Sequence, residues 1–135
     1  NTEPTRKKTE LSVWADIAHL YDLGENTDQT RWAFLEIYRH NKNFSTLKRH
    51  TISTEVFIPL EGVSIIPTAP ADFKDESEIR AFLLDGKCGL IVHAGTWYWQ
   101  PFPITDTATF LVLLKLTVFE DTDEREVGPY CFKIY

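Results

Sequence analysis

The chain has 135 residues, of which 43% are hydrophobic and 25% charged, and this composition predicts a single globular domain with a sizeable core. The net charge of −6 argues against nucleic acid and anionic membranes as partners, because those polyanions require clustered cations. The sequence contains no apolar run of about 18 residues and no basic-then-apolar leader, so we expect neither a membrane span nor a signal peptide.

The first ten residues differ from the rest of the chain. Residues 1–10 are polar and include the cations Arg6, Lys7 and Lys8, so we predict a flexible N-terminal arm there and a single β-barrel domain over residues 11–135. Residues 11–22 place apolar side chains three or four positions apart, which permits either a short helical turn or a strand.

Short strands separated by turn residues dominate the remaining sequence. The connections between them carry Gly, Pro and Asp, as at Asp85–Gly86 and in the loop 67–77. The acidic run 120–126 is expected to be a solvated connection. Strands are expected at 32–40, 56–60, 63–66, 79–84, 89–93, 109–119 and 131–135. Many strands and little helix indicate a β-sandwich or barrel.

The densest set of reactive side chains begins at Lys48. Arg49 and His50 follow directly, and Glu55 comes five residues after His50. On one strand an odd offset sends His50 and Glu55 to opposite faces, so they converge only if the chain bends, for example at Ser53–Thr54. The alternative is an edge strand with a solvated polar face, and the residues alone leave both open.

Arg39 falls on the same face of the predicted strand 32–40 as Ala33, Leu35 and Ile37. A guanidinium on a core-facing row is costly unless it is paired. Arg39 therefore either holds an anion or lies at the strand end with its head in water.

Cys88 and Cys131 have no metal-type spacing. We expect two buried free thiols in a reducing compartment, which favours a cytoplasmic protein.

His50, Glu55 and Gly62 are similar to the second half of the first cupin motif, and residues 93–98 stand where cupins carry the second motif, Pro-x-Gly-x-x-His. More closely, the chain resembles the ureidoglycolate lyase family, a branch of the cupins, over residues 35–115. The resembling pieces are Ile37-Tyr38-Arg39, Arg49-His50, Phe57-Ile58-Pro59, Arg80-Ala81-Phe82, Asp85-Gly86, Gly89, His93 and Trp97.

This resemblance implies an all-β, cupin-type double-stranded β-helix (a jelly-roll barrel) that forms a homodimer. It implies cleavage of ureidoglycolate, a small anionic substrate, to glyoxylate and urea in allantoin and purine catabolism. The site residues that it implies are a catalytic group of His50, His93 and Glu55, and a substrate-binding group of Arg39, Arg49, Lys48, Trp97 and Tyr98.

The chain departs from the family pattern at three of these positions. Lys48 stands where the family usually has Glu, Glu55 where it often has Gln, and Tyr98 where it has His. Cupin metal sites use neutral imidazoles and a carboxylate, so the cofactor stays open; a divalent metal, if one binds, would be held by His50, Glu55 and Tyr98. The alternative function is a non-catalytic cupin-fold module that binds a small carboxylic acid or a sugar.

Overall fold

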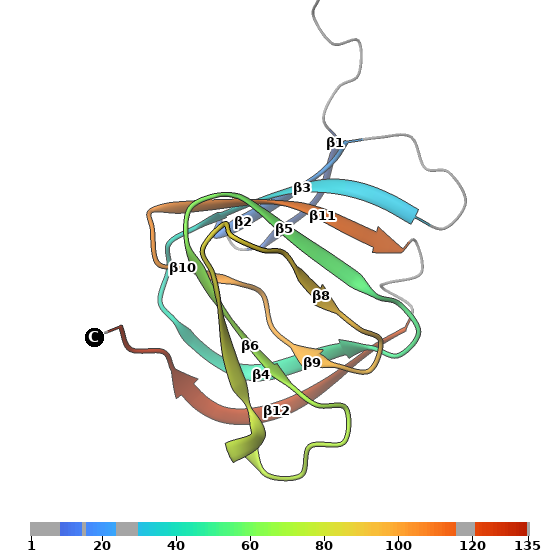
Figure 1. The fold of residues 1–135 in the computed structure, drawn as a ribbon, viewed down its shortest axis with the longest axis vertical. Coiled ribbons are helices and arrows are strands. Elements are labelled where there is room, and N and C mark those ends of the chain that lie inside the picture. The colour runs from blue at the N-terminus through green and yellow to red at the C-terminus, as the bar shows by residue number, and fades with distance from the viewer. Residues whose placement is uncertain (1–8, 15, 24–29, 116–120, 135) are drawn as a thin grey trace, which may run out of the picture.

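The computed structural model of the chain describes residues 9–14, 16–23, 30–115 and 121–134. Within these residues the regular structure is almost entirely β, arranged as two facing sheets (Figure 1). Residues 1–8 of the predicted arm lie outside the described part, and the first strand begins at Thr9. No helix in the described ranges is long and apolar enough to cross a membrane.

The first sheet has six antiparallel strands in the order β1-β2-β3-β11-β5-β8. Strands far apart in the sequence therefore lie side by side, as β11 does between β3 and β5. The strands are β1 (Thr9–Trp14), β2 (Ala18–Asp22), β3 (Thr30–Tyr38), β11 (Thr107–Lys115), β5 (Glu55–Glu61) and β8 (Leu90–Val92).

The second sheet runs in the order β10-β6-β9-β4-β12. Outside this order, β7 also pairs with β6. Its members are β10 (Phe102–Pro103), β6 (Ser64–Ala69), β9 (Trp97–Tyr98), β4 (Asn43–His50), β12 (Thr122–Cys131) and β7 (Arg80–Leu84). A single 3₁₀ turn, η1 (Glu76–Glu78), precedes β7. From β3 onwards the chain passes repeatedly from one sheet to the other, and this topology confirms the predicted jelly-roll barrel of the cupin type.

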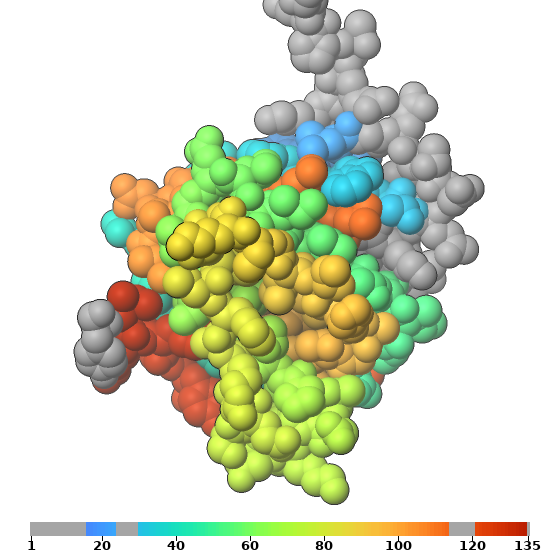
Figure 2. Space-filling view, viewed as in Figure 1, coloured from blue at the N-terminus to red at the C-terminus, as the bar shows by residue number. Residues whose placement is uncertain are grey.

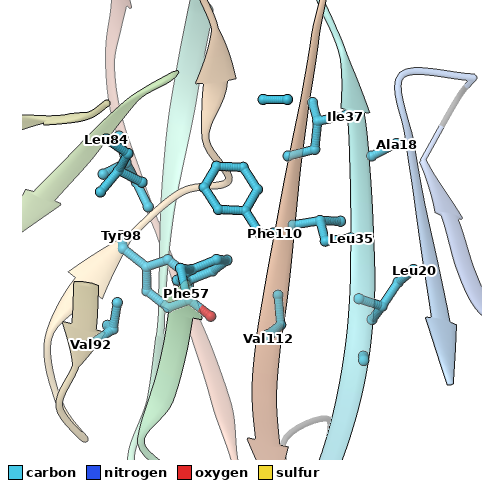
Figure 3. Close-up of a cluster of buried hydrophobic side chains, with 13 residues drawn as sticks. Ala18, Leu20, Leu35, Ile37, Phe57, Leu84, Val92, Tyr98, Phe110 and Val112 are labelled. Atoms are coloured by element: carbon cyan, nitrogen blue, oxygen red, sulfur yellow. The ribbon is translucent and has the colours of Figure 1, made fainter. Parts of the chain in front are cut away.

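The main core fills the space between the two sheets (Figure 3). Side chains of the first sheet, among them Leu35, Phe57, Phe110 and Val112, meet Tyr98 from the second sheet. Alternate residues of a strand point to opposite faces, so each strand contributes every second side chain to this interior.

A second apolar cluster covers the outer face of the second sheet. On β6, Ile66 belongs to the inner core while its neighbour Ile65 packs on the outer cluster; on β9, Tyr98 and Trp97 divide in the same way. Phe73, from the loop after β6, packs edge-on against Trp97. The second sheet is therefore covered by apolar side chains on both of its faces.

Three sequence expectations need correction or completion. Within the run 120–126, residues 122–126 are not a connection, because they belong to β12, which pairs with β4; Glu120 lies outside the described residues. On this strand Asp123, Glu124 and Glu126 are exposed, because only one face of the strand is covered, where Val127 is buried. The strand predicted at 131–135 is also wrong in its described part, because β12 ends at Cys131 and residues 132–134 form no strand. Of the range 11–22, residues 11–14 lie in β1 and residues 18–22 in β2, so these described residues take the strand alternative.

The two cysteines differ from the expectation in one respect. Cys88 and Cys131 are free thiols, as predicted, but both are exposed. Cys88 follows the Asp85–Gly86 turn, and Cys131 is the last residue of β12, so neither lies on a strand face that the core covers.

Candidate functional site

His50 and Glu55 lie at a corner where the chain passes from one sheet to the other. His50 is the last residue of β4 in the second sheet, and Glu55 is the first residue of β5 in the first sheet. The intervening residues 51–54 form no strand, which is the bend that the odd spacing requires. Because the chain changes sheets between them, alternation along one strand no longer sends the two side chains to opposite sides. Both point into the barrel and are buried.

Tyr98 reaches the same point from β9. Its hydroxyl donates to Glu55 Oε1 at 2.6 Å, and its oxygen lies 2.8 Å from His50 Nε2. Nε2 is also 3.3 Å from the same Glu55 oxygen. Three polar side chains from three strands therefore converge, and all three are buried.

The phenol of Tyr98 is held in its neutral form. Burial, with the nearby Glu55 carboxylate adding to it, raises the pKa of Tyr98 well above its usual value. Tyr98 therefore acts as a hydrogen-bond donor to Glu55 and does not become a phenolate near neutral pH.

A small cavity of about 30 Å³ adjoins Glu55 and Tyr98 inside the barrel. This is room for about one water molecule. Its first-sheet wall is mostly apolar, and its polar end lies toward the second sheet. The lining residues are Leu20, Leu35, Phe57, Val112, Lys48, Glu55, Tyr98, Gln100 and Pro101.

Lys48 is the only cation among these nine lining residues, all of which are described. It precedes His50 by two positions on β4, so the two share the inner face, and it lies directly across from Tyr98 in the sheet. Its Nζ is 5.4 Å from the centre of the Tyr98 ring. An anion in an enlarged cavity would therefore have an ammonium group within reach.

Arg49 and Trp97 lie together, but on the outer face of the second sheet. The Arg49 guanidinium stacks 4.6 Å from the Trp97 ring centre, and its Nε donates to Asp123 at 3.1 Å. Trp97 Nε1 donates to the carbonyl of Ala71 at 3.1 Å. The sheet separates this pair from the group formed by His50, Glu55 and Tyr98.

Arg39 and His93 are both exposed. Arg39 follows the end of β3 and forms an ion pair of 2.7 Å with Asp106, whose side chain is 86% exposed. His93 follows β8, and its carbonyl accepts from Thr96 in a turn. The structure thus brings His50, Glu55, Tyr98 and Lys48 together and places the other four predicted site residues elsewhere.

Two residues of this region were not found from the sequence. Gln100 lines the same cavity as Lys48, and Asp121 lies 3.3 Å from the second ring nitrogen of His50. Asp121 belongs to the acidic run that resembled a solvated connection, and nothing in its sequence context distinguished it.

The three candidate metal ligands do not fit a metal ion well. A tyrosine ligand binds as the phenolate, yet its surroundings keep Tyr98 protonated and directed at Glu55. That leaves one imidazole and one carboxylate, fewer than the usual donor set. No group of three or more His, Cys, Asp or Glu in the described ranges is arranged to hold a metal.

Comparison with known proteins finds a match to the family model described as ureidoglycolate lyase over residues 9–133. The ureidoglycolate lyase of Azotobacter vinelandii is 29% identical over 87 residues, which cover 63% of this chain and 47% of that protein. That of Escherichia coli (strain K12 / DH10B) is 35% identical over 69 residues, covering 50% of this chain and 43% of the relative. The chain thus spans about half the length of the curated relatives that it matches.

Solved structures with the same fold are more distant in sequence. The capsular polysaccharide assembling protein CapF from Staphylococcus aureus superposes with a TM-score of 0.63 at 11% identity, over 82% of this chain and 28% of that one. Vicilin from Capsicum annuum gives 0.59 at 20% identity, over 90% and 33%. An oxalate oxidase gives 0.56 at 13% identity, over 75% and 52%. These likenesses support the cupin-type fold alone.

Proposed function

Because the chain belongs to the ureidoglycolate lyase family, we propose that it cleaves ureidoglycolate to glyoxylate and urea inside the barrel. The observation that carries this proposal is the convergence of His50, Glu55 and Tyr98 at the polar end of an otherwise apolar interior. Buried polar groups of this kind are expensive unless they are satisfied, and they are characteristic of reaction sites.

The reaction needs one proton to move from the carbinol oxygen to the departing nitrogen. Glu55 lines the cavity, and its two neighbours both contact the same oxygen, Oε1. We assign Oε2 as the base that takes the carbinol proton while the C–N bond breaks and the C=O bond forms. The same carboxyl then returns the proton to the urea nitrogen, which balances the reaction with one group.

Lys48 is the residue we assign to the substrate carboxylate. It is the cation on the cavity wall, and an ammonium ion can pair with a carboxylate as a point charge. A cavity of about 30 Å³ is smaller than ureidoglycolate, so binding requires the half-buried side chains of Lys48 and Gln100 to move aside. Both are long and flexible, whereas the opposite wall consists of packed core residues.

The assay is release of glyoxylate and urea from ureidoglycolate by the purified protein, measured against the spontaneous decay of the substrate. We expect equimolar products formed faster than in the protein-free control. A protein that binds glyoxylate yet leaves the decay rate unchanged would instead support the non-catalytic module that binds a small carboxylic acid.

We further propose that two copies associate through the face formed by β5, β7 and β8. Leu60, Phe82, Leu83 and Ile91 are exposed large hydrophobics, and the segments that carry them adjoin on the face seen in Figure 2. Such exposure is typical of an interface, and a stable one would bury on the order of 1,000 Å².

Light scattering at tens of micromolar tests this association. Leu83→Glu should give a monomer. Ile52→Glu, which changes an exposed residue of the turn between β4 and β5, should leave the dimer intact. A monomeric wild type, or equal effects of both variants, contradicts the assignment.

We also propose a cytoplasmic location for the protein. Its support is the two free, exposed thiols, which suit a reducing compartment. Fractionation of cells that express the full-length gene product would check it.

A further inference from the structure

A second pocket, of about 220 Å³, lies at the edge of the apolar cluster on the outer face of the second sheet. It is much larger than the cavity of about 30 Å³ beside Glu55. Its wall combines three aromatic rings with one carboxylate, and the proposed reaction uses none of these groups. The lining residues are Phe44, Glu76, Ile79, Tyr130, Cys131 and Phe132.

The three rings of this pocket are in contact with one another through Phe44. Phe44 is buried, and its ring centre lies 5.7 Å from that of Tyr130 and 5.5 Å from that of Phe132. Tyr130 is 39% exposed, and Phe132 is half-buried. The face of an aromatic ring carries a partial negative charge that attracts cations, so accessible rings here can contact a positively charged group.

An irregularity in β12 places Tyr130 at the pocket. Between Glu126 and Tyr130 the pairing with β4 shifts, so that four positions of β12 stand against two of β4. Gly128 lies within this bulge at a φ of +59°, and a Cβ there would lie 2.6 Å from the Tyr130 ring. Glycine therefore permits the tight bend. The bend turns the Gly128 N–H and the Tyr130 hydroxyl toward Glu76, the first residue of η1, which lies beside β12 (Figure 1).

Glu76 offers one free carboxylate oxygen to the pocket. Gly128 N donates at 2.6 Å and the Tyr130 hydroxyl at 2.8 Å, both to Oε1. These two hydrogen bonds, that from Gly128 first, lower the pKa of Glu76, so the side chain is an anion at neutral pH. Within the described part of the chain Oε2 takes no hydrogen bond, and Glu76 is exposed.

The surroundings of Glu76 favour a cation from outside. None of the six lining residues, all described, is a lysine or arginine. Arg125 attracts Glu76, but its guanidinium stacks 3.8 Å from the Phe73 ring centre and donates to the Phe73 carbonyl at 2.9 Å. A polar cleft that Glu76 also lines adds a second carboxylate, Glu126. With a net charge of −6 on the chain, the electrostatic field at this site attracts positive ligands.

We propose that this pocket binds a small organic cation of the alkylammonium class, with its charge beside Oε2 of Glu76 and its alkyl groups on the rings of Tyr130, Phe132 and Phe44. A neutral apolar ligand would leave the carboxylate oxygen without a partner, and a hydrated inorganic ion would not use the rings. An alkylammonium group satisfies both. The site is separate from the barrel interior, so it does not depend on the proposed lyase reaction.

Choline and its neutral isostere 3,3-dimethylbutan-1-ol, in which carbon replaces the charged nitrogen, are the probes. Each is titrated into the full chain and followed by two-dimensional NMR of the backbone amides. We expect choline to bind with a Kd on the order of 1 mM and at least about tenfold more tightly than the isostere. The choline-induced shifts should be largest at residues 76–79 and 126–132.

Two variants that remove the same charge show whether Glu76 holds the cation. Glu76→Gln keeps an acceptor for Gly128 N and Tyr130, and it should weaken choline binding about tenfold without changing that of the isostere. Glu124→Gln changes an exposed residue of β12 outside the pocket and should retain choline binding.

Three results would overturn the proposal: equal affinity for the two probes, choline shifts that are absent or lie elsewhere in the chain, or equal losses of affinity in both variants. If Glu76→Gln does not fold, the comparison of the two probes on the wild type decides alone.

Discussion

Removing one oxygen atom, in Tyr98→Phe, should destabilise the fold far more than the same change at Tyr130. The Tyr98 hydroxyl donates at 2.6 Å to a buried Glu55. A hydrogen bond to a charged group contributes about 1.5–3 kcal/mol, and the ring remains, so no cavity forms. We expect a loss of about 2 kcal/mol in unfolding free energy, or roughly 6–10 °C in Tm for a domain of this size.

Tyr130→Phe is the matched control, because the Tyr130 hydroxyl donates to Glu76 at 2.8 Å on the exposed surface. Its Tm should barely change. The loss of stability caused by Tyr98→Phe also depends on pH. Since folding raises the pKa of Tyr98, its contribution is complete below pH 10 and is lost as the pH rises further, so the gap between wild type and Tyr98→Phe should narrow there. Urea unfolding at pH 7.5 and above pH 10 measures both effects. Equal losses for the two variants at pH 7.5 would refute the reasoning from burial.

Other predictions concern binding, backbone and acid stability. Lys48→Met should weaken glyoxylate binding, measured by calorimetry, by about 2 kcal/mol or more; unchanged affinity would exclude Lys48 as the anion partner. Gly62→Ala should cost more stability than Gly86→Ala: both glycines have positive φ, but a Cβ at Gly62 would overlap the carbonyl oxygen of Thr107, whereas Gly86 has open space. Equal shifts in Tm would contradict this. Folding lowers the pKa of Asp121, so its contribution is present above pH 3.8 and is lost as the pH falls below it. In Asp121→Asn the free energy of unfolding should therefore decrease less than in the wild type as the pH falls through this range. The same pH dependence in both proteins would contradict this role of Asp121.

The strands and the barrel could be predicted from alternation and turn residues, but which face each residue occupies depended on the corner after His50. The odd spacing of His50 and Glu55 required a bend, and the structure supplies it by moving the chain to the other sheet. Strict alternation along β4 already places Lys48 with His50 and turns Arg49 away. The family resemblance assigns Arg49 to substrate binding, while the local period places it on the outer face.

Asp121 and β12 could not be found in this way. A run rich in Asp and Glu has the same pattern whether it is a solvated loop or an edge strand with one open face. Only long-range pairing with β4 distinguishes the two, and that pairing depends on the closure of the barrel rather than on local sequence. Gln100 could not be found from local sequence either. Its place in the cavity wall depends on the path of the chain after β9, which only the complete fold determines.

The most direct test of the central claim is the initial rate of glyoxylate release from ureidoglycolate for the wild type and Glu55→Gln, side by side with the protein-free decay. Glutamine preserves the size of the side chain and can still accept from Tyr98, but it cannot take a proton. We predict that the wild type exceeds the spontaneous rate and that Glu55→Gln, with its fold intact, falls to that rate. A Glu55→Gln variant that retains the wild-type rate would show that the reaction does not take place through this carboxylate.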